Sequence, residues 1–237
     1  MAPTAIEIEL RVTALSPFSV GAGGNAGTLL NKTILRDGRG RPIIPGSQVK
    51  GKARHTAEAL LAGVGLEDQV TLHQDNRRKD EEQNRTLIGR IFGTATHRSP
   101  LRFADLTATL GQPDQPATGA HPSPPLESRL YSTARPSVSL NRRRGAAEEA
   151  RLLFQEISHE QLVFAEPKAV VGTLDDLGHA ALLWAALRLI HSWGGAKTRG
   201  LGWGQVDLKL RWDGVVQEAD VLEQALRALL LNTRTDL

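Results

Sequence analysis

The sequence I-I-P-G-S-Q-V-K-G-K-A-R, residues 43–54, sets the expected fold. Ile43 and Ile44 are β-branched and predict the end of a strand, the Pro-Gly pair that follows predicts a turn, and Ser47 is a preferred helix N-cap residue. Apolar residues then recur at helical spacing and predict one buried face: Val49, Ala53, Ala57, Leu60 and Leu61. The stretch therefore predicts a strand, a turn and an amphipathic helix in succession.

Three cations, Lys50, Lys52 and Arg54, occupy the first two turns of this expected helix. The N-terminal end of a helix carries a positive partial charge, so cations there either reduce stability or bind an anion. A solvated helix face is the other interpretation of the same residues. The stretch also approaches the phosphate-binding motif G-x-x-x-x-G-K-[ST], but Ala53 stands where a magnesium-binding hydroxyl is required, which argues against an NTPase.

The composition is that of a globular protein with a basic surface. A length of 237 residues suffices for a full core, and 40% hydrophobic and 23% charged residues are ordinary proportions. The net charge of +3 is modest, but basic residues cluster at 36–54, at 142–144 and around 197–199, which indicates a polyanionic partner. Cysteine is absent, which excludes disulfides, thiolate metal sites and cysteine nucleophiles. Neither a signal peptide nor a membrane-spanning run is visible, so we expect a cytoplasmic protein.

Apolar and polar residues alternate in three segments and predict strands at Ile6–Leu15, Leu101–Leu110 and Gln205–Trp212. A second helix is expected at Asp175–Ser192, with a buried stripe of Leu182, Leu183, Ala186, Leu189 and Ile190. Two rounds of strand, helix and strand predict an α+β fold with an antiparallel sheet, in the split βαβ pattern.

Two regions fall outside this pattern. The polar residues at about 68–86 predict an exposed insertion. The region at about 112–166 begins rich in proline and continues rich in arginine and glutamate. Its extended segments, Ser137–Leu140 and Leu162–Ala165, predict a protruding arm outside the core.

A second basic element is the glycine-dense loop Gly195–Gly204, which carries Lys197 and Arg199. Glycines let a backbone approach a polyanion closely, and basic side chains bind its phosphates. Trp193 and Trp203 lie beside these cations, where they either stack on bases or pack in the core.

Four motifs carry a family resemblance. I-P-G-S-Q-V-K-G-K-A-R (44–54) resembles the I-P-G-S-x-h-K-G-x-h-R signature of the repeat-associated mysterious protein (RAMP) superfamily of CRISPR systems, specifically its Cas7-type backbone subunits of type III effector complexes. F-G-T (92–94) with S-P-L-R-F-A-D-L (99–106), R-P-S-V-S-L-N-R-R-R-G-A-A (135–147) with L-F-Q-E (153–156), and Gly195–Gly204 resemble later motifs of that family in the same order.

The resemblance implies a single domain over residues 1–237, with a ferredoxin-like (RNA-recognition-motif-like) core, a protruding thumb and loop insertions. It implies an RNA-binding backbone subunit that holds a guide crRNA and spaces the duplex formed with target RNA. The implied partners are neighbouring Cas7-type subunits and Cas10-, Cas5- and Cas11-like subunits, with no membrane. The residues that the resemblance places on RNA are Ser47, Lys50, Lys52, Arg54, Lys197, Arg199, Arg135 and Arg142.

Catalysis is where the sequence departs from the family. Target-cleaving members carry an Asp in the loop ahead of the I-P-G-S motif, and Asn31 occupies that position here. An amide neither binds a divalent cation as a carboxylate does nor acts as a base, so we expect weak or absent target cleavage, no metal site and no cofactor. Asp37 is the fallback acid, although an Asp before Gly38 is typical of a structural turn. The alternative function is an RNA endonuclease: a target-cleaving subunit that uses Asp37 and a divalent metal, or a Cas6-like crRNA-processing enzyme that uses His55 or His191 as acid or base.

Overall fold

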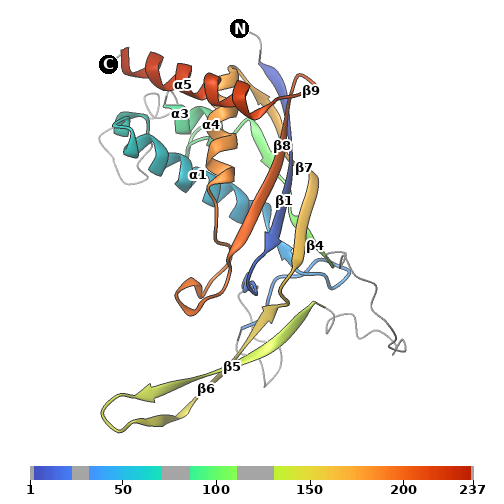
Figure 1. The fold of residues 1–237 in the computed structure, drawn as a ribbon, viewed down its shortest axis with the longest axis vertical. Coiled ribbons are helices and arrows are strands. Elements are labelled where there is room, and N and C mark those ends of the chain that lie inside the picture. The colour runs from blue at the N-terminus through green and yellow to red at the C-terminus, as the bar shows by residue number, and fades with distance from the viewer. Residues whose placement is uncertain (1–2, 23–31, 71–85, 111–130, 236–237) are drawn as a thin grey trace.

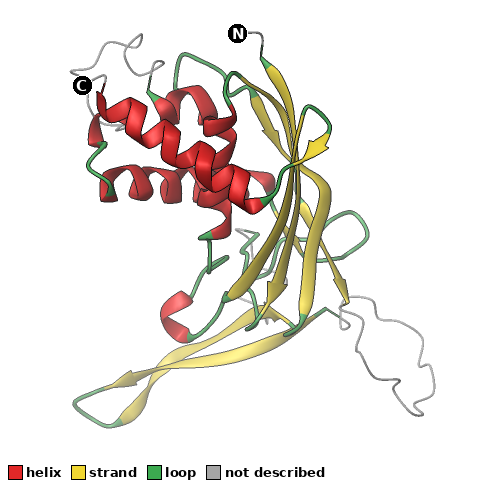
Figure 2. Cartoon of the chain, turned by 45° about the horizontal axis from the view of Figure 1, so that its top comes forward, coloured by secondary structure: helices red, strands yellow, loops and turns green. Residues whose placement is uncertain are grey.

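The computed structural model describes residues 3–22, 32–70, 86–110 and 131–235. Its main body has two layers, a twisted antiparallel sheet and a layer of helices that covers one face of it (Figures 1 and 2). A two-stranded hairpin projects from the end of the sheet opposite the two chain termini (Figure 1). The expected α+β class with an antiparallel sheet is confirmed.

The sheet has the strand order β2-β4-β7-β1-β8-β9, and β3 pairs with β7 beside β4. The strands are β1 (Thr4–Ala14), β2 (Ile43–Ile44), β3 (Leu101–Phe103), β4 (Leu106–Leu110), β7 (Leu162–Leu174), β8 (Gly204–Trp212) and β9 (Val215–Val216). Every pairing is antiparallel. The expected strand Leu101–Leu110 is two strands, because Ala104 and Asp105 leave the ladder between them.

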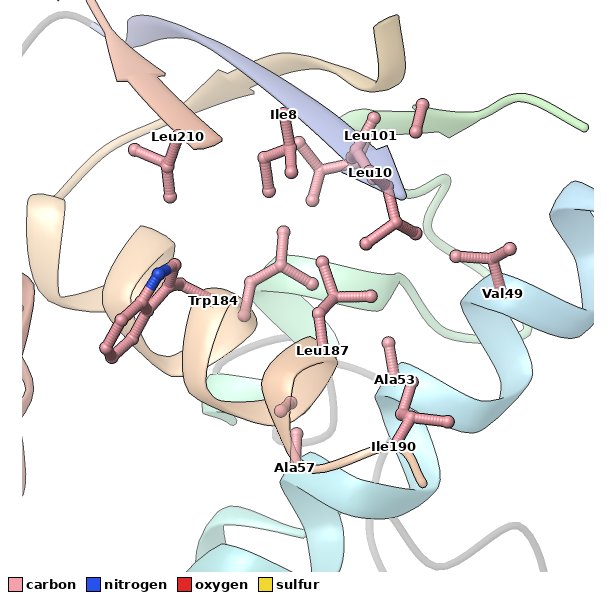
Figure 3. Close-up of a cluster of buried hydrophobic side chains, with 14 of the residues drawn as sticks. Ile8, Leu10, Val49, Ala53, Ala57, Leu101, Trp184, Leu187, Ile190 and Leu210 are labelled. Carbon is pink, nitrogen blue, oxygen red and sulfur yellow. The ribbon is translucent and has the colours of Figure 1, made fainter. Parts of the chain in front are cut away.

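Strand β1 is the centre of the sheet, paired with β7 on one side and β8 on the other. Its alternating pattern buries one face of the strand, as predicted. The buried side chains, each at most 2% exposed, are Ile6, Ile8, Leu10, Val12 and Ala14. These side chains face the helices, and Figure 3 shows Ile8 and Leu10 pointing toward them, with Leu10 near Val49 of α1 (Gly46–Gly63). The period of two therefore decides which face of the sheet receives the helical layer.

Helix α1 buries Val49, Ala53, Ala57 and Leu61, as its spacing predicts, but its cap differs from the expectation. The N-cap is Pro45, whose side chain makes no capping bond, and Ser47 lies exposed in the first turn. The Gly46 N–H instead donates to the Asp105 carboxylate at 2.8 Å. A Cβ on Gly46 would overlap the Phe103 carbonyl oxygen, so this close backbone contact fixes where the helix begins.

Three further helices complete the layer: α3 (Leu87–Phe92), α4 (Leu177–Arg188) and α5 (Ala219–Thr235). Helix α4 is shorter than the expected Asp175–Ser192, and Leu189, expected in its buried stripe, is 53% exposed just beyond its end. Helix α5 was not predicted. Its residue Leu222 is buried, and the half-buried Leu229 lies against Gly178 at the start of α4. None of the helices in the described ranges combines the length and apolarity that a membrane crossing needs.

The expected arm corresponds in part to a hairpin of β5 (Ser132–Asn141) and β6 (Ala146–Ser158). Leu162–Ala165, grouped with the arm on sequence grounds, instead begin β7 in the middle of the sheet, with Leu162 and Phe164 each 1% exposed. The proline-rich start of that region lies outside the described residues. So does most of the expected insertion at 68–86, apart from the end of the short 3-10 helix η1 (Glu67–Gln69) and the residues flanking the gap.

The cap of α4 provides a test of the helical layer. Asp176→Ala is expected to lower the free energy of unfolding by about 1 kcal/mol, because the Asp176 carboxylate accepts the Gly178 N–H at 2.5 Å. Urea denaturation measures the loss. Asp175→Ala is the matched control, since this neighbouring exposed acid makes no capping bond, and it should change stability by less than about 0.5 kcal/mol. A loss in the Asp176 variant no larger than in the control would contradict the capping role.

Candidate nucleic-acid interface

Helix α1 and the 3-10 helix η3 (Lys197–Arg199) bring two lysine side chains together. Lys52 lies in the second turn of α1, and its amino group is close enough to Lys197 to interact with it directly. Partial burial, and after it the positive charge of Lys197, lower the pKa of Lys52 from 10.5 to about 8. Two like charges near each other repel, so an anion between them would relieve a cost that the protein alone does not.

Lys50 and Arg54 extend this positive region along α1. Partial burial lowers the pKa of Lys50, and the charge of Arg54 adds to the effect. Arg54 is already engaged within the chain, because its Nε donates to Glu58 at 2.8 Å and its guanidinium reaches the Gly93 carbonyl. Lys50 and Lys52 are therefore better placed than Arg54 to bind an external anion.

The glycine loop has a fixed shape where it meets the core. Gly194 and Gly202 have φ values of 72° and 86°, and a Cβ on either would overlap a backbone carbonyl oxygen, of Ser19 and Trp193 respectively. The Gly202 N–H donates to the Pro17 carbonyl at 2.9 Å. The loop is thus held at both ends, and it presents η3 at the surface between them.

The two tryptophans beside the loop have different roles. Trp193 is fully buried and belongs to the core, so it is not available to stack on a base. Trp203 is 46% exposed, and its ring stacks on His191 with the centroids 5.3 Å apart. Of the two stacking candidates, the structure leaves Trp203 accessible.

The hairpin meets the same loop near its base (Figure 2). The Arg135 guanidinium donates to the Arg199 carbonyl at 3.4 Å, so β5 and η3 are in direct contact. Arg142, Arg143 and Arg144 lie exposed in the turn between β5 and β6, at the far end of the hairpin (Figure 1). The site residues expected from the sequence therefore divide into a group around Lys52 and Lys197 and a separate basic tip.

A residue that we did not select from the sequence, Glu156, anchors the hairpin. Its carboxylate accepts hydrogen bonds from Ile34 N–H at 3.0 Å, Ser132 Oγ at 2.7 Å and the Arg36 guanidinium at 2.5 Å. Burial raises the pKa of Glu156, but these hydrogen bonds outweigh it and hold the pKa below the usual value. Glu156 thereby joins β6 to the segment that precedes the I-P-G-S motif.

Asp37 stabilises the turn that follows it in the chain. Its Oδ1 accepts the backbone N–H groups of Arg39 and Arg41, both at 2.9 Å, and its Oδ2 accepts Arg41 Nε at 2.8 Å. Burial raises the pKa of Asp37, but the bonds from Arg41 and Arg39 together lower it by more, so the net shift is downward. An acid held ionised in this way is a poor proton donor, and both of its oxygens are occupied. The structural interpretation of Asp37 is favoured over a catalytic one.

The remaining candidates for catalysis do not form a site. His55 is exposed on α1, and His191 is exposed, stacked on Trp203. Within the described ranges, no three His, Asp or Glu side chains gather as a metal site would require. Asn31 lies outside the described residues.

The fold and the site define an α+β protein with a positive surface built from a helix start, a glycine loop and the base of a hairpin, a combination suited to a polyanion. The chain belongs to the RAMP superfamily, whose family model matches residues 11–206. The membership expected from the sequence motifs is confirmed.

Solved structures share the fold, and two of them are structures of the Type III-B Cmr-beta. The chain matches a cryo-EM structure of the Type III-B Cmr-beta bound to cognate target RNA with a TM-score of 0.59 and 12% identity, over 88% of this chain and 61% of that one. It matches a cryo-EM structure of Type III-B Cmr-beta in the apo state with a TM-score of 0.56 and 13% identity, over 87% of this chain and 96% of that one. The chain thus spans about 61% of the length of the first of these relatives. None of the curated proteins matches the sequence.

Proposed function

We propose that this protein is a Cas7-type backbone subunit of a type III CRISPR interference complex, which binds guide RNA and has no cleavage activity of its own. The proximity of Lys52 to Lys197 carries the proposal, because two elements distant in sequence place like charges near each other where a phosphate would be stabilised. Membership of the RAMP superfamily and the fold shared with Cmr-beta structures support it. The proposed partners are guide crRNA, complementary target RNA and other Cas subunits.

The strand order supports a ferredoxin-like core. The elements β1, α1, β4, β7, α4 and β8 follow one another along the chain, and their strands lie in the order β4-β7-β1-β8. This is the split βαβ arrangement, in which the third strand lies between the first and second. Helices α1 and α4 both pack on one face, as that arrangement requires (Figure 2).

We assign the hairpin as the thumb. Four large apolar side chains on it are between 46% and 64% exposed, namely Val138, Leu140, Leu152 and Leu153. Val138 and Leu152 face each other across the two strands and form one apolar patch. Apolar side chains of this kind insert between bases, while the arginines at the tip bind phosphates, so the hairpin is suited to interrupt a guide–target duplex.

The proposal of a non-cleaving subunit is tested by incubating the assembled complex with complementary labelled RNA. We expect the target to bind without being cut at this subunit, since Asn31 replaces the family's Asp and Asp37 is held by Arg39 and Arg41. Denaturing gels measure cleavage. Cuts at regular intervals that disappear in an Asp37→Ala complex would establish the target-cleaving alternative. Cleavage of precursor repeat RNA by the isolated chain would establish the processing enzyme.

A further inference from the structure

A polar cavity lies at the other end of α4 from the lysine pair. It has a volume of about 230 Å³ and is lined by side chains that include Arg90, His97, Pro100, Thr173, Asp175 and His179. Helix α4 separates the two places: its first turn contributes His179 to the cavity, while the chain that leaves its last turn leads to η3 (Figure 1). Its 12 residues span about 18 Å. The cavity is therefore separate from the proposed RNA-binding surface.

His179 contributes a titratable ring to the cavity wall. It is 4% exposed as a residue, and none of the hydrogen bonds among the described residues involves its imidazole. A ligand in the cavity therefore has a ring nitrogen available for hydrogen bonding. Burial lowers the pKa of His179, Asp176 and Asp175 raise it and Arg90 lowers it, with a net downward shift that leaves the ring neutral at pH 7. A neutral imidazole has one N–H to donate.

The groups around His179 favour an anion. The Arg90 guanidinium, in the last turn of α3, forms no ion pair or hydrogen bond with another described residue and lines the cavity beside His97. Arginine binds phosphate oxygens through its parallel N–H groups, and a histidine ring adds a further donor. Because no three His, Asp or Glu side chains in the described ranges are placed to hold a metal, a cation is the poorer fit.

Asp175, which lines the cavity, determines which anions the cavity prefers. Asp175 contributes a carboxylate, which accepts hydrogen bonds and repels an oxyanion that has no proton. Inorganic phosphate as a monoanion or dianion, and a phosphate monoester as a monoanion, carry a P–OH group that can donate to this carboxylate, whereas sulfate at neutral pH has no proton to donate. We propose that the cavity binds a phosphate group, held by Arg90, His97 and His179 and selected over sulfate by Asp175.

The experiment follows the histidine rings of the full chain by NMR during titration with sodium phosphate. The His179 signals should shift saturably, with a dissociation constant in the millimolar range, and the pKa of His179 should rise when the site is filled. Arg90→Gln should weaken binding about tenfold or more, because it removes a charged hydrogen-bond donor from an exposed position without opening the core. Arg102→Gln is the matched control, an exposed arginine on β3 outside the cavity, and should leave the dissociation constant unchanged.

Two further probes identify the source of the phosphate. Sulfate should bind more weakly than phosphate, and Asp175→Asn should reduce this difference in affinity between the two anions. Phenyl phosphate that binds as well as phosphate indicates the terminal phosphate of a larger molecule, whereas its exclusion indicates free phosphate. A linear, unsaturated shift of His179, an equal dissociation constant in the Arg90→Gln protein, or equal binding of sulfate would each overturn the assignment.

Discussion

Lys52→Glu combined with Lys197→Glu is expected to lower the affinity for single-stranded RNA by at least about 100-fold at moderate salt. Each lysine donates a charged hydrogen bond to a phosphate, which contributes about 1.5–3 kcal/mol, and the reversed charges repel the strand. The slope of log affinity against log salt should flatten by about 1.4, because two phosphate contacts are lost and each contributes about 0.7 on a single strand. Fluorescence anisotropy over a series of salt concentrations measures both quantities.

The matched control is Lys168→Glu with Lys209→Glu, which changes the net charge by the same amount on other parts of the sheet. Lys168 forms only an exposed ion pair with Glu7, and Lys209 is exposed on β8, so neither lies at the proposed interface. A decrease in affinity equal to that of the control would show that net charge alone matters. The lysine pair would then be a solvated surface, the interpretation that the sequence left open.

The lowered pKa of Lys52 predicts that both the stability of the protein and its binding of RNA depend on pH. Lys52 has a pKa of about 8 in the folded protein against 10.5 for an ordinary lysine, so its charged form is destabilised by folding. Without RNA, the stability of the protein should rise with pH between about 8 and 10.5, as the unfolded chain still binds this proton and the folded chain has lost it. A phosphate beside Lys52 stabilises the charged form, so RNA binding above pH 8 should take up protons.

Periodicity predicted the regular elements of this fold well where one face is buried. β1, β8 and the buried face of α1 follow from alternation and from 3-4 spacing alone. The cap of α1 did not follow, because Gly46 is held by Asp105 and Phe103, which are distant in sequence. Helix α5 was not predicted, although Leu222, Leu226 and Leu229 recur at helical spacing.

The site was predicted in its residue types but not in its contacts. Lys52 and Lys197 were both selected as cations, yet only the folded chain shows that they lie close together, and that Arg54 is occupied by Glu58. Glu156 was overlooked because its partner Ile34 lies 122 positions away and a single glutamate in a charged strand has no distinguishing pattern. Long-range pairing of this kind follows from topology, and no local sequence signal encodes it.

Glu156→Gln is expected to lower the free energy of unfolding of the hairpin base by about 3 kcal/mol, because it removes the charge that Arg36 pairs with in a mostly buried position. Glutamine also offers only one acceptor oxygen to three donors, so at least one of Ile34 N–H, Ser132 Oγ and Arg36 loses its bond. Hydrogen exchange at residues 132–141 and 152–158 measures the loss locally, and urea denaturation measures it globally. Glu148→Gln near the exposed tip is the control, since its one bond, from Asn141, is at the surface.

The pH dependence of stability tests whether the charge of Glu156, and not only the shape of its side chain, stabilises the hairpin. Burial raises its pKa, but the bonds from Ile34, Arg36 and Ser132 lower it more, so the folded pKa lies below the ordinary value of 4.5. Its contribution to stability is therefore present above about pH 4.5 and is lost as the pH falls through the folded pKa. The wild-type hairpin should lose protection from exchange at acid pH, while the Glu156→Gln hairpin, already less protected, should change little over the same range. Parallel pH profiles in the two proteins would contradict this role, and the orientation of the hairpin, with Arg135 against Arg199, would then depend on other contacts.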